Sequence, residues 1–520
     1  MLTKSVSLLC DKFQGINRTS SSFATSNIFA SDMENVELFN TGQLSGVGIR
    51  TMKGNTSVFT FNDEREKIIN IYESIQGGIS YCFIYTETNT EGKLYLFDRI
   101  SSTVTLKKDN LSKTGVSFGV DFAQGWSDLF IFTNSKEILS VEIGHYNENQ
   151  QLDEITVFQP VDVEGNSVEG FGLTVFDGRL WLFNKFRLWY SVKEDCYDFA
   201  TSSPSVITSA GYIEFAKNIT AITPYLGSLA VFSKDSSCLI TVTEDLLYAK
   251  TDDSPGGCAS YNSFVFHGTQ LYFYDNTKKA IFAFSQIISG DKTLSDNIAL
   301  DIQEELSAIP KSMLDNIKML SVVQPDKNEF WMILPTDGSK TTILIYDYIH
   351  QQWVKRVSQK INALRNINGE LLSVSDRKIL AEYNGDTFDG EILYAYYKCS
   401  PLDLHSNTTL KVTYNPPRLV LDDTRCNCFL TSYNVDYSST KTYSIKKFIR
   451  NVVKTFLYWD VSYWDSGVCY PFKESKVIKR LPMSKFRTIE IVFESESTSQ
   501  EVQGFSVMNI EFPCIVVKQM

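Results

Sequence analysis

Residues 254–285 read SPGGCASYNSFVFHGTQLYFYDNTKKAIFAFS and contain three short apolar runs, SFVF, LYFY and AIFAF. The runs are rich in aromatic and β-branched residues, which favour strands. Gly268 can adopt the positive φ of a tight turn between the first two runs, and Asp275 and Asn276 suit a second turn. Runs this short and apolar are typical of buried strands rather than amphipathic helices. The stretch therefore predicts a three-stranded antiparallel sheet.

The same succession of apolar runs and short turns recurs between about residues 65 and 385. Seven candidate units share it, and their third runs centre near residues 95, 138, 188, 239, 281, 344 and 379. The intervals between these centres range from 35 to 63 residues. A period near about 40–50 residues with three or four short strands per unit is typical of β-propeller blades. The sequence therefore predicts a β-propeller, and its loose period leaves six, seven or eight blades open.

The longest interval contains the sequence LSDNIALDIQEELSAIP at 294–310. Ile302, Leu306 and Ile309 recur there at helical spacing, and Pro310 cannot continue a helix. One helix is therefore predicted within a chain that is otherwise rich in strands.

Composition divides the chain into three predicted regions. Residues 1–64 are turn-rich and polar, which suggests an N-terminal arm with edge strands. Residues 65–385 hold the repeated units. Residues 386–520 contain alternating segments such as FRTIEIVFES and GFSVMNIEF, which are typical of a half-buried sheet or sandwich. The predicted fold is thus all-β, a propeller with an N-terminal arm and a C-terminal β-sheet or sandwich platform.

Charge is distributed unevenly along the chain. The net charge is −12, yet residues 386–520 hold 16 basic and 15 acidic residues, so the first 385 residues carry −13. Residues 441–487 contain 11 basic residues and 3 acidic ones. An acidic body with one basic segment argues against a simple nucleic-acid-binding domain. No stretch approaches the roughly 18 apolar residues of a membrane span, so none is expected.

Histidine and cysteine give little sign of a metal or catalytic site. His267 lies beside Gly268 in a predicted turn, and no second histidine or cysteine stands at ligand spacing from it. The ten cysteines are scattered, which is typical of buried reduced thiols. No P-loop, G-x-S-x-G or G-x-G-x-x-G motif occurs.

Grouped carboxylates are the remaining candidates for chemistry. Those at 194–198, 252–253 and 422–423 could supply the acid and base of a glycosidase, but solvated loop acids explain them better. The sequence NGDTFDGE at 384–391 lacks the D-x-D-x-D-G alternation of a calcium loop. We therefore predict no catalytic residue, no cofactor and no metal ligand.

The order of segments resembles that of the tail-nozzle, or packaged-DNA stabilisation, proteins of short-tailed (podovirus-like) bacteriophages. The matching segments are FQGINRTSS and GVGIRTMKGN in the N-terminal region, then DGRLWLFNKFRLWYSV and SLAVFSKDSSCLITVT. SPGGCASYNSFVFHGTQLYFYD, NEFWMILP and ILIYDYIHQQW follow, before the strand-rich C-terminus. The resemblance covers most of the chain, and it rests on order rather than on one sharp motif.

The resemblance implies a non-enzymatic propeller subunit of a virion tail, assembled in the host cytoplasm. It also implies a homo-hexameric ring or tube below the head-to-tail adaptor, which carries tail fibres or spikes and conducts duplex DNA without sequence readout. Two other functions stay open: a propeller glycoside hydrolase or depolymerase, and a lectin-like binding module. In a nozzle the basic segment is expected to contact the next subunit or the adaptor, although a solvated basic face is an alternative; its residues are Lys446, Lys447, Arg450, Lys454, Lys476, Lys479, Arg480, Lys485 and Arg487.

Overall fold

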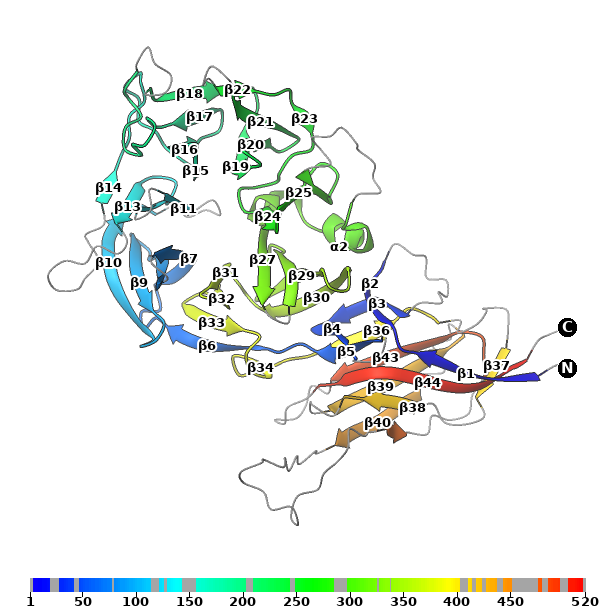
Figure 1. The fold of residues 1–520 in the computed structure, drawn as a ribbon. Helices are drawn as coiled ribbons and strands as arrows, with labels where there is room; N and C mark the ends of the chain where they lie inside the picture. Colours follow the sequence, from blue (N-terminus) through cyan, green and yellow to red (C-terminus); the bar gives the residue numbers. More distant parts are fainter. Residues whose placement is uncertain are drawn as a thin grey trace, which may run out of the picture. The chain divides into compact units, whose positions relative to one another are not determined.

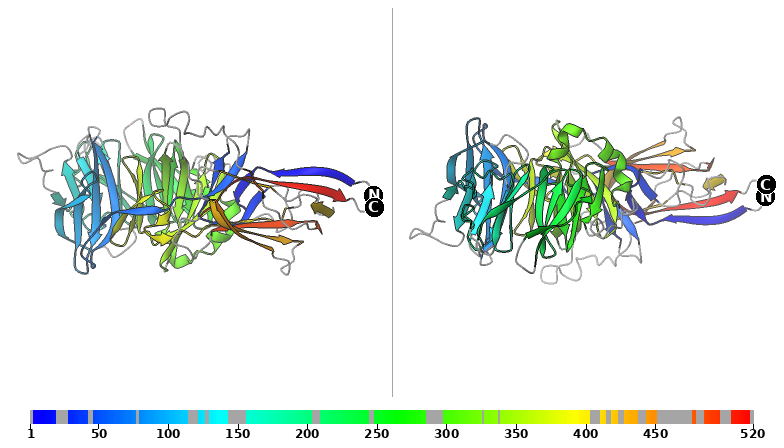
Figure 2. Two further views of the ribbon diagram at one scale, coloured as in Figure 1. Left: turned by 90° about the horizontal axis from the view of Figure 1, so that it is seen from below. Right: turned by 90° about the horizontal axis from the view of Figure 1, so that it is seen from above.

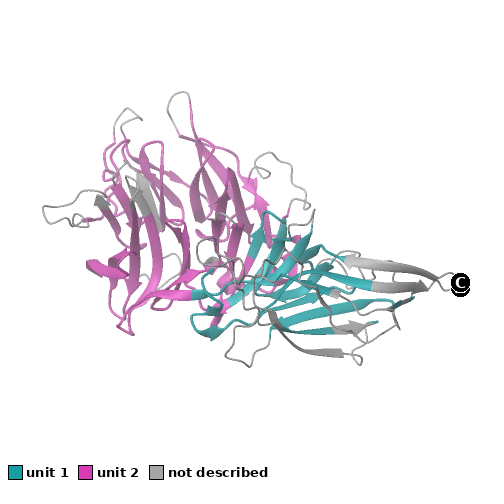
Figure 3. Cartoon of the chain, turned by 60° about the horizontal axis from the view of Figure 1, so that its bottom comes forward, with its two compact units in different colours: residues 1–55, 345–357, 383–520 teal, residues 56–344, 358–382 magenta. Residues whose placement is uncertain are grey.

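A computed structural model of the chain describes most of its 520 residues. The described ranges are 3–18, 28–41, 46–76, 79–113, 121–125, 129–142, 156–202, 209–243, 248–284, 297–324, 327–336, 338–402, 410–413, 418–422, 427–436, 443–450, 476–478, 485–495 and 504–517. The chain divides into two compact units (Figure 3). Unit 1 comprises residues 1–55, 345–357 and 383–520, and unit 2 comprises residues 56–344 and 358–382.

Seven small sheets follow one another along the described residues that lead through unit 2, and each is built mainly from consecutive strands. The first holds β7 (Lys67–Gln76), β8 (Ile79–Glu87), β9 (Gly92–Asp98) and β10 (Thr103–Leu111). The second holds β11 (Asp121–Gly125), β12 (Leu129–Thr133), β13 (Ile138–Glu142) and β14 (Thr156–Phe158). The third holds β15 (Gly172–Phe176), β16 (Arg179–Phe183), β17 (Arg187–Tyr190) and β18 (Gly211–Glu214).

The remaining four sheets continue the same plan. The fourth holds β19 (Ile219–Tyr225), β20 (Ser228–Ser233), β21 (Ser236–Val242), β22 (Tyr248–Lys250) and β23 (Ser254–Pro255), and the fifth holds β24 (Phe264–His267), β25 (Gln270–Asp275) and β26 (Ala280–Ala283). The sixth holds β27 (Lys318–Gln324), β28 (Lys327–Ile333), β29 (Lys340–Asp347) and β30 (Gln352–Gln359). The seventh holds β31 (Ala363–Ile367), β32 (Glu370–Ser375) and β33 (Lys378–Glu382), which β6 (Asn55–Thr60) joins beside β33.

These strands confirm the repeat that the sequence predicted. The third strand of every sheet contains the residue at which the sequence centred it, from 95 in β9 to 379 in β33. In the stretch 254–285, Phe264 pairs with Phe273, and Phe273 pairs with Phe282, both in antiparallel register. Gly268 has a φ of 59°, as the tight turn requires.

The sheets of unit 2 pack face to face because several of their strands, unlike the largely exposed β10, are apolar on both sides. β12 and β16 are buried at every position. One core cluster joins the first two sheets, where the rings of Phe83 and Phe130 stack with centroids 4.7 Å apart. Further clusters join the second sheet to the third, and the third to the fourth and fifth. Each sheet therefore depends on its neighbours for burial.

The first strands of neighbouring sheets lie next to one another. β15 contacts β11 and β19, and β27 contacts β24 and β31. β31 of the seventh sheet also contacts β7 of the first. Figure 1 shows these sheets following one another around a central region, and in Figure 2 their strands run roughly along one direction.

The seventh sheet also joins the two ends of unit 2, a boundary that we call the seam. The main-chain N–H of Phe61 donates to Arg377 O at 3.0 Å, and that of Ile68 donates to Asp376 O at 2.7 Å. A core cluster of residues from 58–104 and 363–381 fills the space between the seventh and first sheets. The seam therefore combines strand pairing with apolar burial.

A half-buried lysine links three sheets at the seam. Lys318 Nζ, at the start of β27, donates to the main-chain oxygen of Asn362, whose side-chain amide donates to Ile68 O at 3.3 Å. Burial, with the nearby positive charge of Arg365, lowers the pKa of Lys318 to about 8.

The helix predicted between 294 and 310 is present but short. A 3₁₀ turn, η2 (Leu300–Ile302), leads into α2 (Gln303–Ser307), and a second 3₁₀ turn, η3 (Lys311–Asn316), follows. Ile302, Leu306 and Ile309 are all buried, as their spacing predicted. Pro310 has extended backbone with ψ 140°, which ends the helix. No helix among the described ranges has the length and hydropathy needed to cross a bilayer.

Unit 1 contains two sheets among its described residues, and both combine strands from the two ends of the chain. One has the order β4 (Val36–Asn40), β5 (Val47–Thr51), β44 (Ser506–Val517), β37 (Leu410–Thr413) and β42 (Lys485–Phe486), with β1 (Thr3–Cys10) and β38 (Arg418–Leu421) also on β44, and β41 (Lys476–Ile478) on β38. The other has the order β2 (Phe13–Ile16), β3 (Ile28–Glu34), β36 (Tyr396–Cys399), β43 (Ile489–Ser495), β39 (Asn427–Val435) and β40 (Tyr443–Arg450). The described residues before 52 thus contribute strands to sheets that also hold strands from the C-terminal part of the chain.

The short pair β34 (Thr387–Phe388) and β35 (Glu391–Ile392) also lies in unit 1, as do the end of β29 and most of β30, and β34 pairs with Asn55. β43 alternates buried and half-buried residues, as its sequence predicted. The chain enters unit 2 at residue 56 and leaves it at residue 382, whereas the sequence suggested limits of 65 and 385.

Truncating a ring in the shared cores is expected to destabilise the fold. Trp181 and Phe273 are fully buried, and the Trp181 ring lies 4.9 Å from that of Tyr248 and 5.0 Å from that of Tyr190. Trp181→Ala and Phe273→Ala should each lower the free energy of unfolding by about 3–5 kcal/mol, measured by chemical denaturation. Phe186→Ala, at a ring that is 51% exposed, is the control and should cost far less. If Trp181→Ala and Phe273→Ala lowered the free energy of unfolding no more than Phe186→Ala does, the packing described would be contradicted.

Lys318 is expected to make stability depend on pH. Between about pH 8 and 10.5 the unfolded chain binds this proton and the folded chain does not, so the free energy of unfolding should rise with pH across that window. Lys318→Met should flatten this rise relative to the unchanged protein, as measured by denaturation at several pH values. Lys311→Met, at an exposed lysine, is the control and should keep the original slope. An unchanged slope in Lys318→Met would show that Lys318 stays charged in the folded protein.

Candidate functional site

The basic segment lies in unit 1 and is divided between its two sheets. Lys446, Lys447 and Arg450 lie in β40, and Lys476 and Lys485 lie in β41 and β42 of the other sheet. The segment is therefore not one continuous strand. Three of its predicted contact residues lie outside the described residues: Lys454, Lys479 and Arg480.

β40 occupies the end of its sheet among the described strands. It pairs with β39, in a register that places Arg450 opposite Asn427 and shifts between Phe429 and Thr431. A strand at the end of a sheet offers main-chain donors and acceptors along one side, and lysine there discourages non-specific pairing. The position suits either a solvated edge or a contact with an acidic partner.

Arg487 is the basic residue of the set whose surroundings are best defined. It is exposed, and its main-chain N–H donates to Asp436 Oδ1 at 2.6 Å, as does the N–H of Thr488 at 3.0 Å. The Asp436 carboxylate therefore stabilises the turn that leads into β43.

The carboxylates at 194–198 cap turns. Asp195 Oδ1 accepts the N–H of Tyr197 at 2.9 Å. Asp198 accepts the N–H groups of Ala200 and Thr201 and the Thr201 hydroxyl. Partial burial opposes ionisation of Asp198, yet these hydrogen bonds hold its pKa below the ordinary value. The oxygens of the Asp198 carboxylate already accept hydrogen bonds within its own turn, so this group is poorly placed for general acid–base catalysis.

Two of the other candidate carboxylates also have partners. Asp253 pairs with Lys250 at 2.9 Å, and Asp422 Oδ2 accepts the Ser506 hydroxyl at 3.3 Å, whereas Asp423 lies outside the described residues. The 384–391 loop forms the β34–β35 turn. In the described part of the chain, no group of three or more His, Cys, Asp or Glu residues could hold a metal ion.

The two histidines that the structure describes lie at turns between strands. His267 ends β24, and its Nδ1 lies 3.4 Å from Ser321 Oγ; burial lowers its pKa. His350 Nδ1 lies 2.5 Å from Asp347 Oδ2 in the β29–β30 turn. His145 and His405 lie outside the described residues. The six cysteines whose side chains are described are buried, as predicted.

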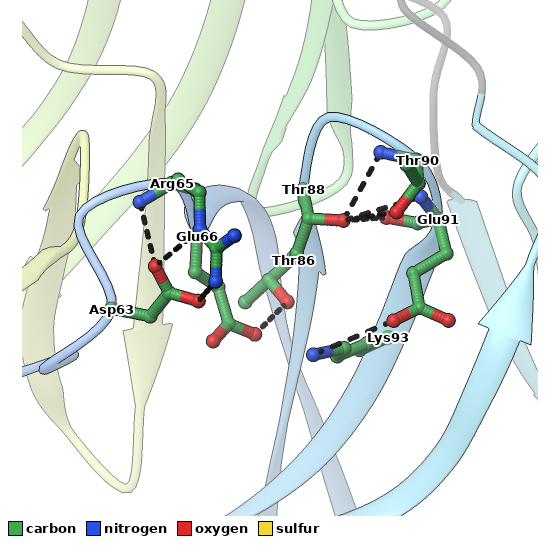
Figure 4. Close-up of polar contacts among 8 residues, drawn as sticks. All are labelled: Asp63, Arg65, Glu66, Thr86, Thr88, Thr90, Glu91 and Lys93. Atoms are coloured by element: carbon green, nitrogen blue, oxygen red, sulfur yellow. Dashed lines mark hydrogen bonds and ion pairs between the residues drawn. The ribbon is translucent and has the colours of Figure 1, made fainter.

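Figure 4 shows a polar cluster at the ends of β7, β8 and β9 that the sequence did not reveal. Each carboxylate in this view has its own donor. Arg65 donates to both oxygens of Asp63 at 3.1 Å, the Thr86 hydroxyl donates to the buried Glu66 at 2.7 Å, and Lys93 pairs with Glu91 at 3.6 Å. Exposed pairs such as Arg65–Asp63 contribute little to stability, because water screens their charges. The cluster therefore stabilises strand ends and does not form an acid–base pair.

Arg179 of β16 is buried although it is charged. One guanidinium nitrogen donates to Ser191 O at 2.6 Å and to Ser209 O at 2.7 Å. The guanidinium carbon lies 5.2 Å from the Tyr190 ring centroid and 5.6 Å from that of Tyr248. Carbonyl oxygens and ring faces compensate the buried charge. In sequence the residue reads only as one charge in an apolar run.

One small cavity lies on the fourth sheet, and its walls include Lys217, Lys250 and Ser237. Its volume of about 10 Å³ suits a single water molecule. Lys217 pairs with Asp235 at 3.0 Å, and Lys250 pairs with Asp253, which also lines the cavity. The cavity is too small to enclose a sugar ring or a cofactor.

Comparison with known proteins leaves the family of the chain open. No protein-family model and no curated protein matches it. Among solved structures, it is similar to a virginiamycin B lyase from Staphylococcus aureus at 10% identity and a TM-score of 0.38, over 66% of this chain and 98% of that one. It is also similar to Hsv2 from Kluyveromyces lactis at 12% identity and a TM-score of 0.28, over 56% and 98% of the two chains. Both TM-scores are too low to carry an inference about fold or function.

Proposed function

We propose that this protein is a structural subunit of a viral tail nozzle. In this proposal unit 2 is a seven-bladed β-propeller, and copies of the chain form a ring or tube below a head-to-tail adaptor that closes and conducts packaged DNA. The serial sheets, the adjacent first strands and the seam support the propeller. The order of sequence segments supports the nozzle.

The observation that carries the proposal is the unequal charge of the two units. Unit 2 holds 26 Lys and Arg against 41 Asp and Glu, a net charge of −15. Unit 1 holds 23 against 20, a net charge of +3. Rings form when two different surfaces of neighbouring copies fit together. Complementary charge favours such a contact and disfavours contact between like units.

The same charges suit DNA conduction. Each lysine or arginine that contacts a phosphate adds a salt-dependent attraction, which would slow a sliding duplex. An acidic wall repels the duplex, and so the basic segment should not line the lumen. We place it at the contact with the next subunit or with the adaptor.

An enzymatic and a sugar-binding function remain the alternatives. A glycoside hydrolase or depolymerase would lose polysaccharide turnover when a single aspartate or glutamate is replaced. A lectin-like module would stay monomeric and bind a specific sugar.

Assembly is the first test of the nozzle. The purified protein should form a hollow sixfold ring or tube, seen by electron microscopy, with the mass of a hexamer in sedimentation. A strictly monomeric protein at high concentration, with or without sugar binding, would contradict the nozzle.

The basic segment provides the second test. Replacing Lys446, Lys447 and Arg450 together with glutamine should weaken ring or adaptor assembly, most strongly at low salt, where charge contacts matter most. A matched control removes three exposed charges of unit 2, with Lys234→Gln, Lys278→Gln and Lys311→Gln, and should assemble normally. If the first variant assembled normally but lost affinity for duplex DNA, the basic segment would be a DNA-binding surface. Its assignment to a subunit or adaptor contact would then be wrong.

A further inference from the structure

The seam differs from every other sheet boundary in unit 2, because the strands that meet there are not neighbours in sequence. β6 opens unit 2 and β33 closes it, yet they pair in the seventh sheet. Bringing distant segments together costs loop-closure entropy. β6 stays joined to the first sheet by the chain, whereas its pairing with β33 is held by non-covalent contacts alone.

The two chain segments that flank the seam are tied together within unit 1. Residues 53–55 lead into β6, and residues 383–389 return from β33. Gly54 N donates to Gly385 O at 2.9 Å, and Asp389 N donates to Asn55 O at 2.9 Å. A Cβ atom at Gly54 would lie 1.8 Å from the main-chain oxygen of Thr387, so only glycine permits this approach.

Arg356 of β30 contacts both flanking segments at once. It is fully buried, and its guanidinium donates to Lys53 O at 2.8 Å and to Gly54 O at 3.4 Å. On the returning segment, the guanidinium carbon lies 4.8 Å from the Phe388 ring centroid and 5.7 Å from that of Tyr383. A planar guanidinium can donate from two nitrogens while its face lies over aromatic rings, which an ammonium cannot do.

We propose that Arg356 is a latch that keeps the seam closed, and that the ring of sheets opens between β6 and β33 when this latch is released. The contacts of Arg356 hold the segments on either side of the seam within bonding distance, which reduces the entropy cost of closing it. Opening at the seam therefore requires that Arg356 leave the Lys53 and Gly54 carbonyls and the two rings. The proposal holds whether or not the protein is a nozzle subunit.

Hydrogen exchange measures the opening directly. Arg356→Met keeps the length of the side chain but removes its donors and charge, whereas Arg356→Lys keeps the charge and loses the planar fork. In Arg356→Met the amides of residues 53–61 and 377–389 should exchange about 10-fold faster or more, because they are freed by local opening. Arg356→Lys should show a smaller increase in the same peptides. Amides of β16 and β17 should keep their rates in both variants.

Arg179→Met is the matched control, since Arg179 is also buried, donates to main-chain oxygens and lies over two rings. It should speed exchange in the third sheet and leave the seam peptides unchanged. Unchanged exchange at the seam in folded Arg356→Met would overturn the latch. If Arg356→Met does not fold, unchanged seam exchange in Arg356→Lys would do the same. An equal increase over all sheets in the Arg356 variants would show general destabilisation and also reject the latch.

Discussion

The architecture depends on the burial of both faces of short strands. Strands such as β12 and β16 are buried at every position, so a single sheet of this kind cannot face water on either side. Each sheet needs a neighbour on both faces, and sheets in series leave two end faces uncovered. The contact of β31 with β7, and the core beneath it, covers those last two faces. In the proposed propeller, closure of the ring would bury these faces at the seam.

Local features made the repeat predictable from sequence. Gly227 and Gly369 have φ values of 77° and 76°, and each separates two apolar runs, so turn and strand positions could be assigned from residue type alone. The short helix was located correctly but overextended. Its N-cap, Ile302, provides no side-chain cap, a 3₁₀ turn precedes it, and the extended Pro310 follows it closely.

Pairing between distant segments could not be predicted from the sequence. Nothing in the β6 sequence NTSVFT indicates that it joins β33, since the partner lies at the other end of unit 2. Arg356 in the strand QWVKRVSQ reads as an ordinary surface charge, because its importance depends on carbonyls and rings contributed by remote residues. Charge counting found the basic segment, but not its division between two sheets.

The central claim is that unit 2 is a closed ring of seven sheets in which β6 completes the last one. An electron cryo-microscopy or crystal structure that resolves the strands tests this most directly. We expect seven sheets around one axis, with β6 beside β33 and β31 against β7. Two stacked sheets across residues 65–385, or a β6 strand paired elsewhere, would contradict the account.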